Sequence, residues 1–205
     1  VSGSVLLVAG SVLGTLAYLT DTEQAVNTFT VGNVAIKLLE TDTDNSDSDG
    51  DGDGYDLKNE YKLVPGGEYT KDPTITVEEG SEDAYVRMIL TVHNASEVES
   101  CGGYTAFIDG INADWVLEGS NEDETANTIS YEFRHAEIVD GEDGELSPLF
   151  EKLIIPTNLD GDKLEALVNG GFKMVIDGHA IQATGFENDV DSAWTAFDAQ
   201  YADKT

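Results

Sequence analysis

The residues with the clearest chemistry lie in a carboxylate-rich tract at positions 41–60. Alternate aspartates, a glycine and a late glutamate follow the pattern D-x-D-x-D-G-x5-E, in which a curled backbone directs oxygen ligands at one Ca²⁺ ion. Positions 1, 3, 5, 6, 7 and 12 of this pattern are Asp49, Asp51, Asp53, Gly54, Tyr55 and Glu60. The sequence therefore predicts a calcium site in which Gly54 provides the bend and the other five residues are the ligands.

Two alternatives remain open for this tract. A solvated acidic linker has the same composition, and offset registers such as Asp47-Asp49-Asp51-Gly52 also fit the short part of the pattern. Asp42, Asp44 and Asp47 are candidates for a second ion. Position 8 is Asp56 where an apolar residue is usual, and no helical periodicity flanks the loop. We therefore expect a calcium-ordered surface insertion and not an EF-hand.

No motif in the sequence predicts an enzyme. The three histidines, His93, His135 and His179, lie on separate strand-like segments, without the H-E-x-x-H spacing of zinc hydrolases. A G-x-S-x-G elbow, a phosphate-binding loop and a dinucleotide fingerprint are also missing from the sequence. Asn94-Ala95-Ser96 is a glycosylation sequon, which matters only in a host that glycosylates.

The charge of the chain limits its partners. Among 205 residues, 41 Asp and Glu outnumber 10 Lys and Arg, which gives a net charge of -31. A surface this acidic repels nucleic-acid phosphates and anionic lipids, so we expect no nucleic-acid partner and favour cations. Hydrophobic residues still make up 40%, enough for a folded core. The single cysteine, Cys101, rules out an intramolecular disulfide, and we expect it to be buried.

An uncharged apolar segment lies near the start of the chain, from Val5 to Leu19. Its 15 residues fall short of the roughly 20 that a membrane-spanning helix needs. It fits the core of an export signal cleaved before Tyr18, or a retained segment that a neighbouring subunit buries as a donor strand. In the second interpretation the donor residues are Val5, Leu6, Leu7, Val8, Val12, Leu13, Leu16, Tyr18 and Leu19.

The rest of the chain, residues 21–205, is expected to form one domain dominated by strands. Period-two alternation predicts strands at 84–94, 129–133 and 172–176, another after a break at Gly178, and a kinked strand at 29–38. Helical spacing predicts short helices at 105–115, 162–168 and 190–201. This pattern predicts an all-β sandwich with short helical insertions and the acidic loop 41–60.

Three segments of the chain resemble the TasA/camelysin family of SipW-processed bacterial surface and biofilm-fibre proteins. They are GTLAYLTDTEQAVNTFTVGNVAIKL at 14–38, LVPGGEYTKDPTITVEEGSEDAYVRM at 63–88 and GHAIQATGF at 178–186. The resemblance implies a jelly-roll sandwich that is secreted, processed at the Ala17-Tyr18 junction, and assembled by donating its N-terminal strand to the next copy. If cleavage removes residues 1–17, the donor is the shorter and more polar segment that begins at Tyr18.

The sequence therefore predicts a structural subunit of an extracellular filament. We expect its partners to be copies of itself in a head-to-tail homopolymer, with divalent cations bridging filaments and no small-molecule substrate. Other hypotheses are a camelysin-like surface metallopeptidase, a monomeric calcium-binding adhesin anchored in the membrane by residues 1–20, and a pilin in which residues 1–28 form a central helix. They differ in where the apolar segment goes and in whether a metal-ligand cluster forms.

Overall fold

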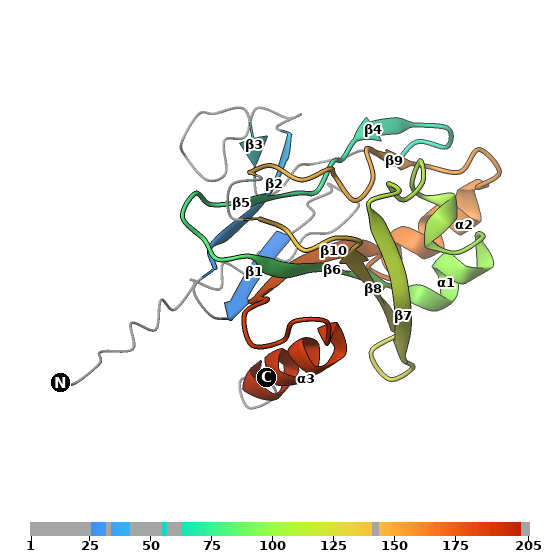
Figure 1. The fold of residues 1–205 in the computed structure, drawn as a ribbon. Helices are drawn as coiled ribbons and strands as arrows, with labels where there is room; N and C mark the ends of the chain where they lie inside the picture. The colour runs from blue at the N-terminus through green and yellow to red at the C-terminus, as the bar shows by residue number, and fades with distance from the viewer. Residues whose placement is uncertain (1–25, 32–33, 42–54, 57–62, 141–143, 202–205) are drawn as a thin grey trace.

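The computed structural model describes residues 26–31, 34–41, 55–56, 63–140 and 144–201 (Figure 1). The described chain consists mainly of strands in antiparallel sheets, with few and short helices. The expected all-β class is therefore confirmed. The N-terminal segment and most of the acidic insertion lie outside the described residues.

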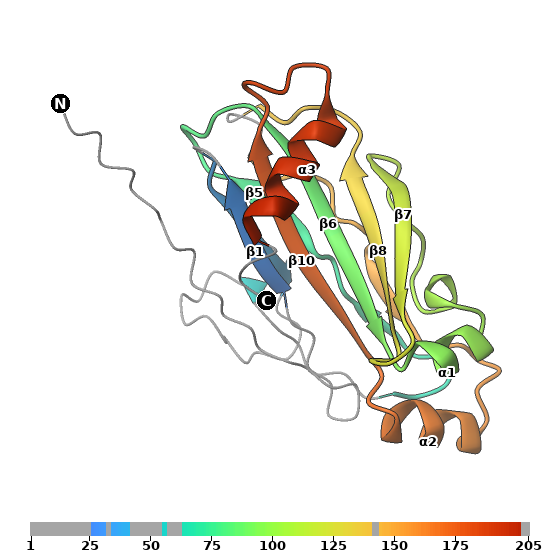
Figure 2. The same cartoon turned by 90° about the horizontal axis from the view of Figure 1, so that it is seen from below.

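One layer of the fold is a five-stranded sheet with the strand order β1-β10-β6-β8-β7. Strand β1 is parallel to β10, and the other neighbours are antiparallel. Figure 2 shows the long central strands of this sheet side by side. The strands are β1 (Val26–Val31), β6 (Ala84–His93), β7 (Trp115–Asp123), β8 (Thr128–His135) and β10 (Lys173–Gln182).

Shorter strands form the opposite layer. A three-stranded sheet has the order β3-β2-β5, and β4 pairs with β9 in a two-stranded sheet. The chain after residue 143 extends the first of these sheets, because the Leu146 amide donates to the Ile75 carbonyl. The strands are β2 (Ile36–Thr41), β3 (Tyr55–Asp56), β4 (Glu68–Thr70), β5 (Thr74–Val77) and β9 (Lys152–Ile154).

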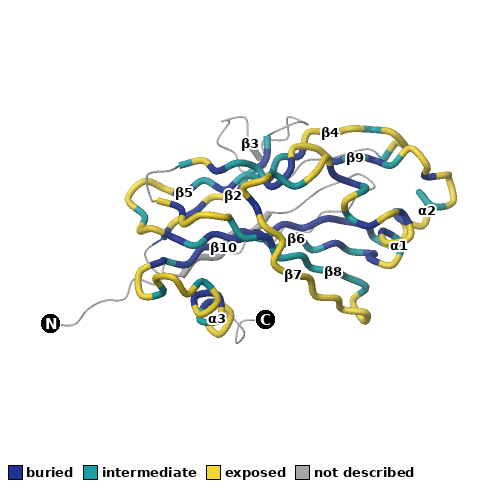
Figure 3. Tube along the Cα trace, turned by 45° about the vertical axis from the view of Figure 1, so that its right-hand side comes forward, coloured by how far each residue is buried: buried dark blue, intermediate teal, exposed yellow. Residues whose placement is uncertain are grey.

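The hydrophobic core fills the space between the two layers. Along β6 the side chains of Val86, Met88, Leu90 and Val92 are buried, as the period-two alternation predicted. Figure 3 shows the buried stretches concentrated in the central strands. The layers approach so closely at Gly178 that a Cβ there would lie 3.2 Å from Ile75 and 3.3 Å from Leu38.

In the described part of the chain three α-helices flank the sheets: α1 (Ala95–Ser100), α2 (Gly161–Asn169) and α3 (Val190–Tyr201). Helix α2 begins after Asp160, whose side chain accepts a hydrogen bond from the Lys163 amide and so caps the helix. Helix α3 packs on the outer face of the five-stranded sheet (Figure 2). The helices expected at 162–168 and 190–201 are confirmed.

Several expected boundaries were wrong. The predicted helix at 105–115 is only a 3₁₀ turn at Tyr104–Ala106, and Trp115 begins β7, which the prediction missed. The predicted kinked strand at 29–38 is two strands, β1 and β2, in different sheets. Gly178 does not interrupt β10, because its role is the close contact between the layers. In each case tertiary packing overrides the local pattern.

Asn94 links the helical end of the fold. Its backbone adopts a left-handed conformation, and its Nδ2 lies 3.2 Å from the carbonyl oxygens of both Ala166 and Leu167 on α2. Its Oδ1 accepts a hydrogen bond from the Asn127 side chain. Because Asn94 is buried, the sequon cannot receive a glycan in this folded state.

The contact between Asn94 and Gly170 leads to a stability prediction. A Cβ on Gly170 would overlap the Asn94 side chain, so Gly170→Ala is expected to lower the free energy of unfolding by about 1–3 kcal/mol. Gly170 follows the end of α2, and Gly161 begins it. Gly161→Ala is the matched control, since nothing lies within 4 Å of a Cβ there. Urea unfolding of both variants tests this, and equal stabilities would contradict it.

Candidate functional site

The base of the acidic insertion is a hairpin stem formed by β2 and β3. Tyr55 pairs with Thr41, and Asp56 pairs with Glu40. Tyr55, the predicted ligand at position 7, therefore lies where the stem begins. The other predicted ligands, Asp49, Asp51, Asp53 and Glu60, lie outside the described residues.

A buried ion pair lies beside this stem. Glu40 at the end of β2 contacts Lys71, which follows β4, and both side chains are 0% exposed. Burial lowers the pKa of Lys71, and the carboxylate of Glu40 opposes this shift. A lone charge at this depth would be strongly unfavourable, so each charge depends on the other.

A second contact holds the same strand end. The carboxylate of Asp72 accepts one hydrogen bond from the Thr41 amide at 2.8 Å and another from the Thr41 hydroxyl at 2.6 Å. Residues 71–72 thus hold both residues at the end of β2. The last residues before the acidic insertion are therefore fixed to the body of the domain, whatever the insertion itself does.

The described residues contain no group of three or more His, Cys, Asp or Glu side chains that could hold a metal ion. The histidines lie apart in the sheet: His93 ends β6, His135 ends β8, and His179 is in β10. Cys101 is buried, as expected. No helix in the described part of the chain is long and apolar enough to cross a bilayer.

The five-stranded sheet has two dissimilar edges. Within the described residues β1 pairs only with β10, and β7 pairs only with β8. The sequence of β1, VNTFTV, carries no charge. Strand β7 carries Glu118, Glu122 and Asp123, and its pairing with β8 shifts register between Leu117 and Gly119. Acidic side chains on an edge oppose its pairing with another copy of this acidic chain.

Both arginines of the sequence lie next to each other under α3. Arg87 and Arg134 are cross-strand partners on β6 and β8. Arg87 contacts Asp198 of α3 and lies 4.3 Å from the Trp194 ring centre. Arg134 pairs with Asp191 of α3 at 2.7 Å. The two arginines therefore attach the C-terminal helix to the sheet.

His179 belongs to the same cluster. Its Nδ1 accepts a hydrogen bond from Nε of Arg87 at 3.0 Å, and its ring stacks on Phe197 with 4.8 Å between ring centres. Burial and, to a lesser extent, the charge of Arg87 lower the pKa of His179 to about 3. The imidazole is therefore neutral at physiological pH and acts as an acceptor.

Comparison with family models, with curated proteins and with solved structures finds no match to this chain. Its function must therefore be argued from its own residues.

Sequence reasoning missed the Glu40–Lys71 pair and the arginine cluster. Alternation did place Arg87 on the outer face of its strand, opposite the buried residues. Only the register of β6 against β8 and the position of α3 reveal its partners. For Lys71 the sequence offers no comparable signal, because it lies in a connection between two short strands.

Proposed function

We propose that this protein is a structural subunit of an extracellular filament, in which each copy donates its apolar N-terminal segment to the next. The observation that carries the proposal is the uncharged β1 edge, which pairs on one side only among the described residues. An edge strand leaves amide and carbonyl groups unpaired, and an extended apolar segment from a neighbour satisfies them.

The difference between the two edges favours this assembly. The chain carries a net charge of -31, so association between copies requires contacts that avoid carboxylates. The β7 edge presents acidic side chains, whereas β1 and the segment from Val5 to Leu19 carry none. An uncharged strand pairing with an uncharged edge gives each copy one acceptor and one donor, and hence a polar filament.

The resemblance to the TasA/camelysin family supports the same function and suggests a jelly-roll arrangement of the strands. In this proposal the protein is secreted. The acidic insertion binds calcium through Asp49, Asp51, Asp53, Tyr55 and Glu60. Its fixed stem at Thr41 and Tyr55 would transmit ordering of the loop to β2. Divalent cations would also screen repulsion between neighbouring filaments.

Electron microscopy of the purified chain tests the proposal. We expect filaments from the chain with residues 1–20, and monomers from a chain without them, because removal of the segment leaves the β1 edge without a partner strand. Both forms are imaged with and without a calcium chelator. Filaments that shorten or disappear with chelator would assign calcium to assembly.

Point variants test whether assembly needs the apolar side chains of the N-terminal segment, because they leave the segment itself in place. Leu7→Asp with Leu13→Asp is expected to abolish filaments, because two charges would have to be buried. Leu7→Met with Leu13→Met keeps apolar volume and is expected to assemble.

Monomers from the unmodified chain would overturn the filament proposal, and binding of that chain to vesicles would favour the membrane-anchored adhesin. Zinc-dependent proteolysis would favour the metallopeptidase.

A further inference from the structure

The outer edge of β7 is a separate surface, and its exposure is unusual for a strand of nine residues. Every residue after Trp115 in this strand is exposed, including Val116 at 44% and Leu117 at 48%. Among the described residues its only partner is β8. A long exposed edge is a template for an added strand.

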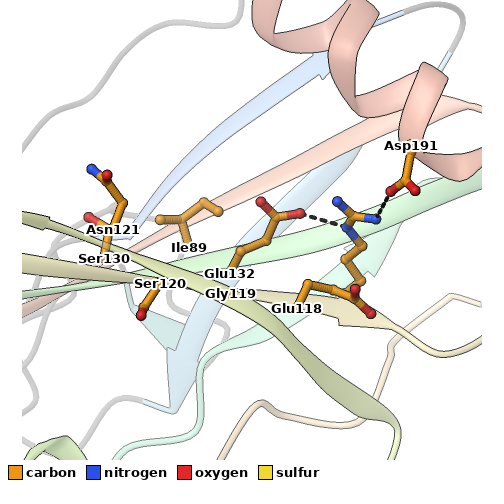
Figure 4. A pocket seen from close by; sticks show the side chains of 9 residues that line it. Ile89, Glu118, Gly119, Ser120, Asn121, Ser130, Glu132 and Asp191 are labelled. Carbon is orange, nitrogen blue, oxygen red and sulfur yellow. Dashed lines mark hydrogen bonds and ion pairs between the residues drawn. The ribbon is translucent and has the colours of Figure 1, made fainter.

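An open hollow of about 440 Å³ lies beside this edge on the outer face of the sheet. Ile89 belongs to its lining, and Glu118, Glu132 and Asp191 surround it (Figure 4). The guanidinium of Arg134 also lines the hollow, but it is already paired with Glu132 and Asp191. The hollow therefore has an apolar contact surface and an excess of negative charge, which suits the methylenes and ammonium group of a lysine.

A second copy of this chain is poorly suited to the surface. It carries the same net charge of -31, and most of its described cations are already engaged. Lys71, Arg87 and Lys173 are buried, and Lys37, Arg134 and Lys152 pair with carboxylates of their own chain. Like charges brought together at an edge oppose association.

We propose that the β7 edge binds an extended, lysine-rich segment of a different protein. The segment's backbone extends the sheet beside β7, and its alternate basic side chains lie over the outer face, one of them in the hollow between Glu118, Glu132 and Asp191. Main-chain hydrogen bonds supply affinity, and the carboxylates select the basic partner. This inference uses the opposite edge from the filament and does not depend on assembly.

Synthetic peptides test the proposal on the full chain. The probe is a nine-residue peptide of alternating lysine and valine, the length of β7. A control peptide carries the same charges but is N-methylated at every residue, so its backbone cannot donate hydrogen bonds to β7 from either edge. A glutamate-valine peptide reverses the charge. We expect binding of the first peptide only, with slower hydrogen exchange in β7 and unchanged exchange in β1.

Charge reversal in the protein locates the site. Glu118→Lys is expected to weaken binding about tenfold or more, because it replaces attraction by repulsion beside the hollow. Glu79→Lys makes the same charge change at an exposed turn away from β7 and is expected to have little effect. Equal binding of the N-methylated peptide, or equal effects of the two substitutions, would reduce the interaction to general attraction by an acidic surface and overturn the proposal. Protection of β7 at high protein concentration without peptide would assign the edge to a second copy instead.

Discussion

Lys71→Met is expected to lower the free energy of unfolding by about 3–5 kcal/mol. The substitution keeps most of the apolar stem of the side chain but removes the ammonium group that compensates Glu40. Both side chains are 0% exposed, so water cannot replace the lost partner without opening the structure. The cost arises from an uncompensated buried carboxylate and not from a lost surface contact.

Chemical denaturation of matched variants separates these causes. Lys37→Met on β2 removes an exposed pair with Glu78, whose atoms are 4.0 Å apart, and is expected to cost at most about 1 kcal/mol. Replacing both buried partners, Glu40→Leu with Lys71→Met, is expected to recover most of the stability, since two apolar side chains need no compensation. A double variant no more stable than Lys71→Met alone would contradict this account.

The second large effect is loss of stability in acid through His179. Its pKa is about 3 in the folded chain and 6.5 when unperturbed. Between pH 3 and pH 6.5 the unfolded chain binds more protons than the folded chain. The contribution of His179 to the free energy of unfolding is therefore complete above pH 6.5 and is lost as the pH falls towards 3. A difference of this size corresponds to about 5 kcal/mol.

His179→Asn tests the acid effect, because the asparagine Oδ1 takes the place of the imidazole Nδ1 as acceptor for Arg87 but does not titrate. The carboxylates of Glu132 and Asp198, which bind Arg87, are present in both proteins, so their contribution cancels in the difference. We therefore expect the stability of the wild type relative to the variant to fall as the pH drops from 6.5 to 3. A constant difference across this range would refute the prediction. His93→Gln is expected to remove a second part of the stability loss in acid, since burial and the nearby Lys173 lower the pKa of His93 to about 4.

The sequence predicted the parts of the fold that local patterns control. Alternation located β6, whose inward-facing residues are buried, and β8, whose apolar residues Ile129, Tyr131 and Phe133 alternate although only Phe133 is buried. It missed β7, because this edge strand has exposed residues on both faces and so lacks the alternation. It also merged β1 and β2, because the apolar pattern runs from Phe29 to Leu38 although the two strands belong to different sheets.

The candidate functional site likewise has one part that local spacing predicts and another part that it does not. A metal-ligand pattern is visible in sequence because its spacing is local, so the calcium prediction could be made and still awaits a test. The contacts of Lys71 with Glu40 and of Arg87 with Asp198 join residues 31 and 111 positions apart. No spacing rule predicts such pairs, since they depend on which strands become neighbours and where α3 packs.

The parallel pairing of β1 with β10 has a mechanical consequence. Six residue pairs join these strands, from Val26 with Ile176 to Val31 with Ile181. Tension applied to the chain ahead of β1, along the strand, would load all of these pairs together in shear instead of opening them one by one. The strand that follows the N-terminal segment is therefore joined to the centre of the domain in the geometry that best resists pulling.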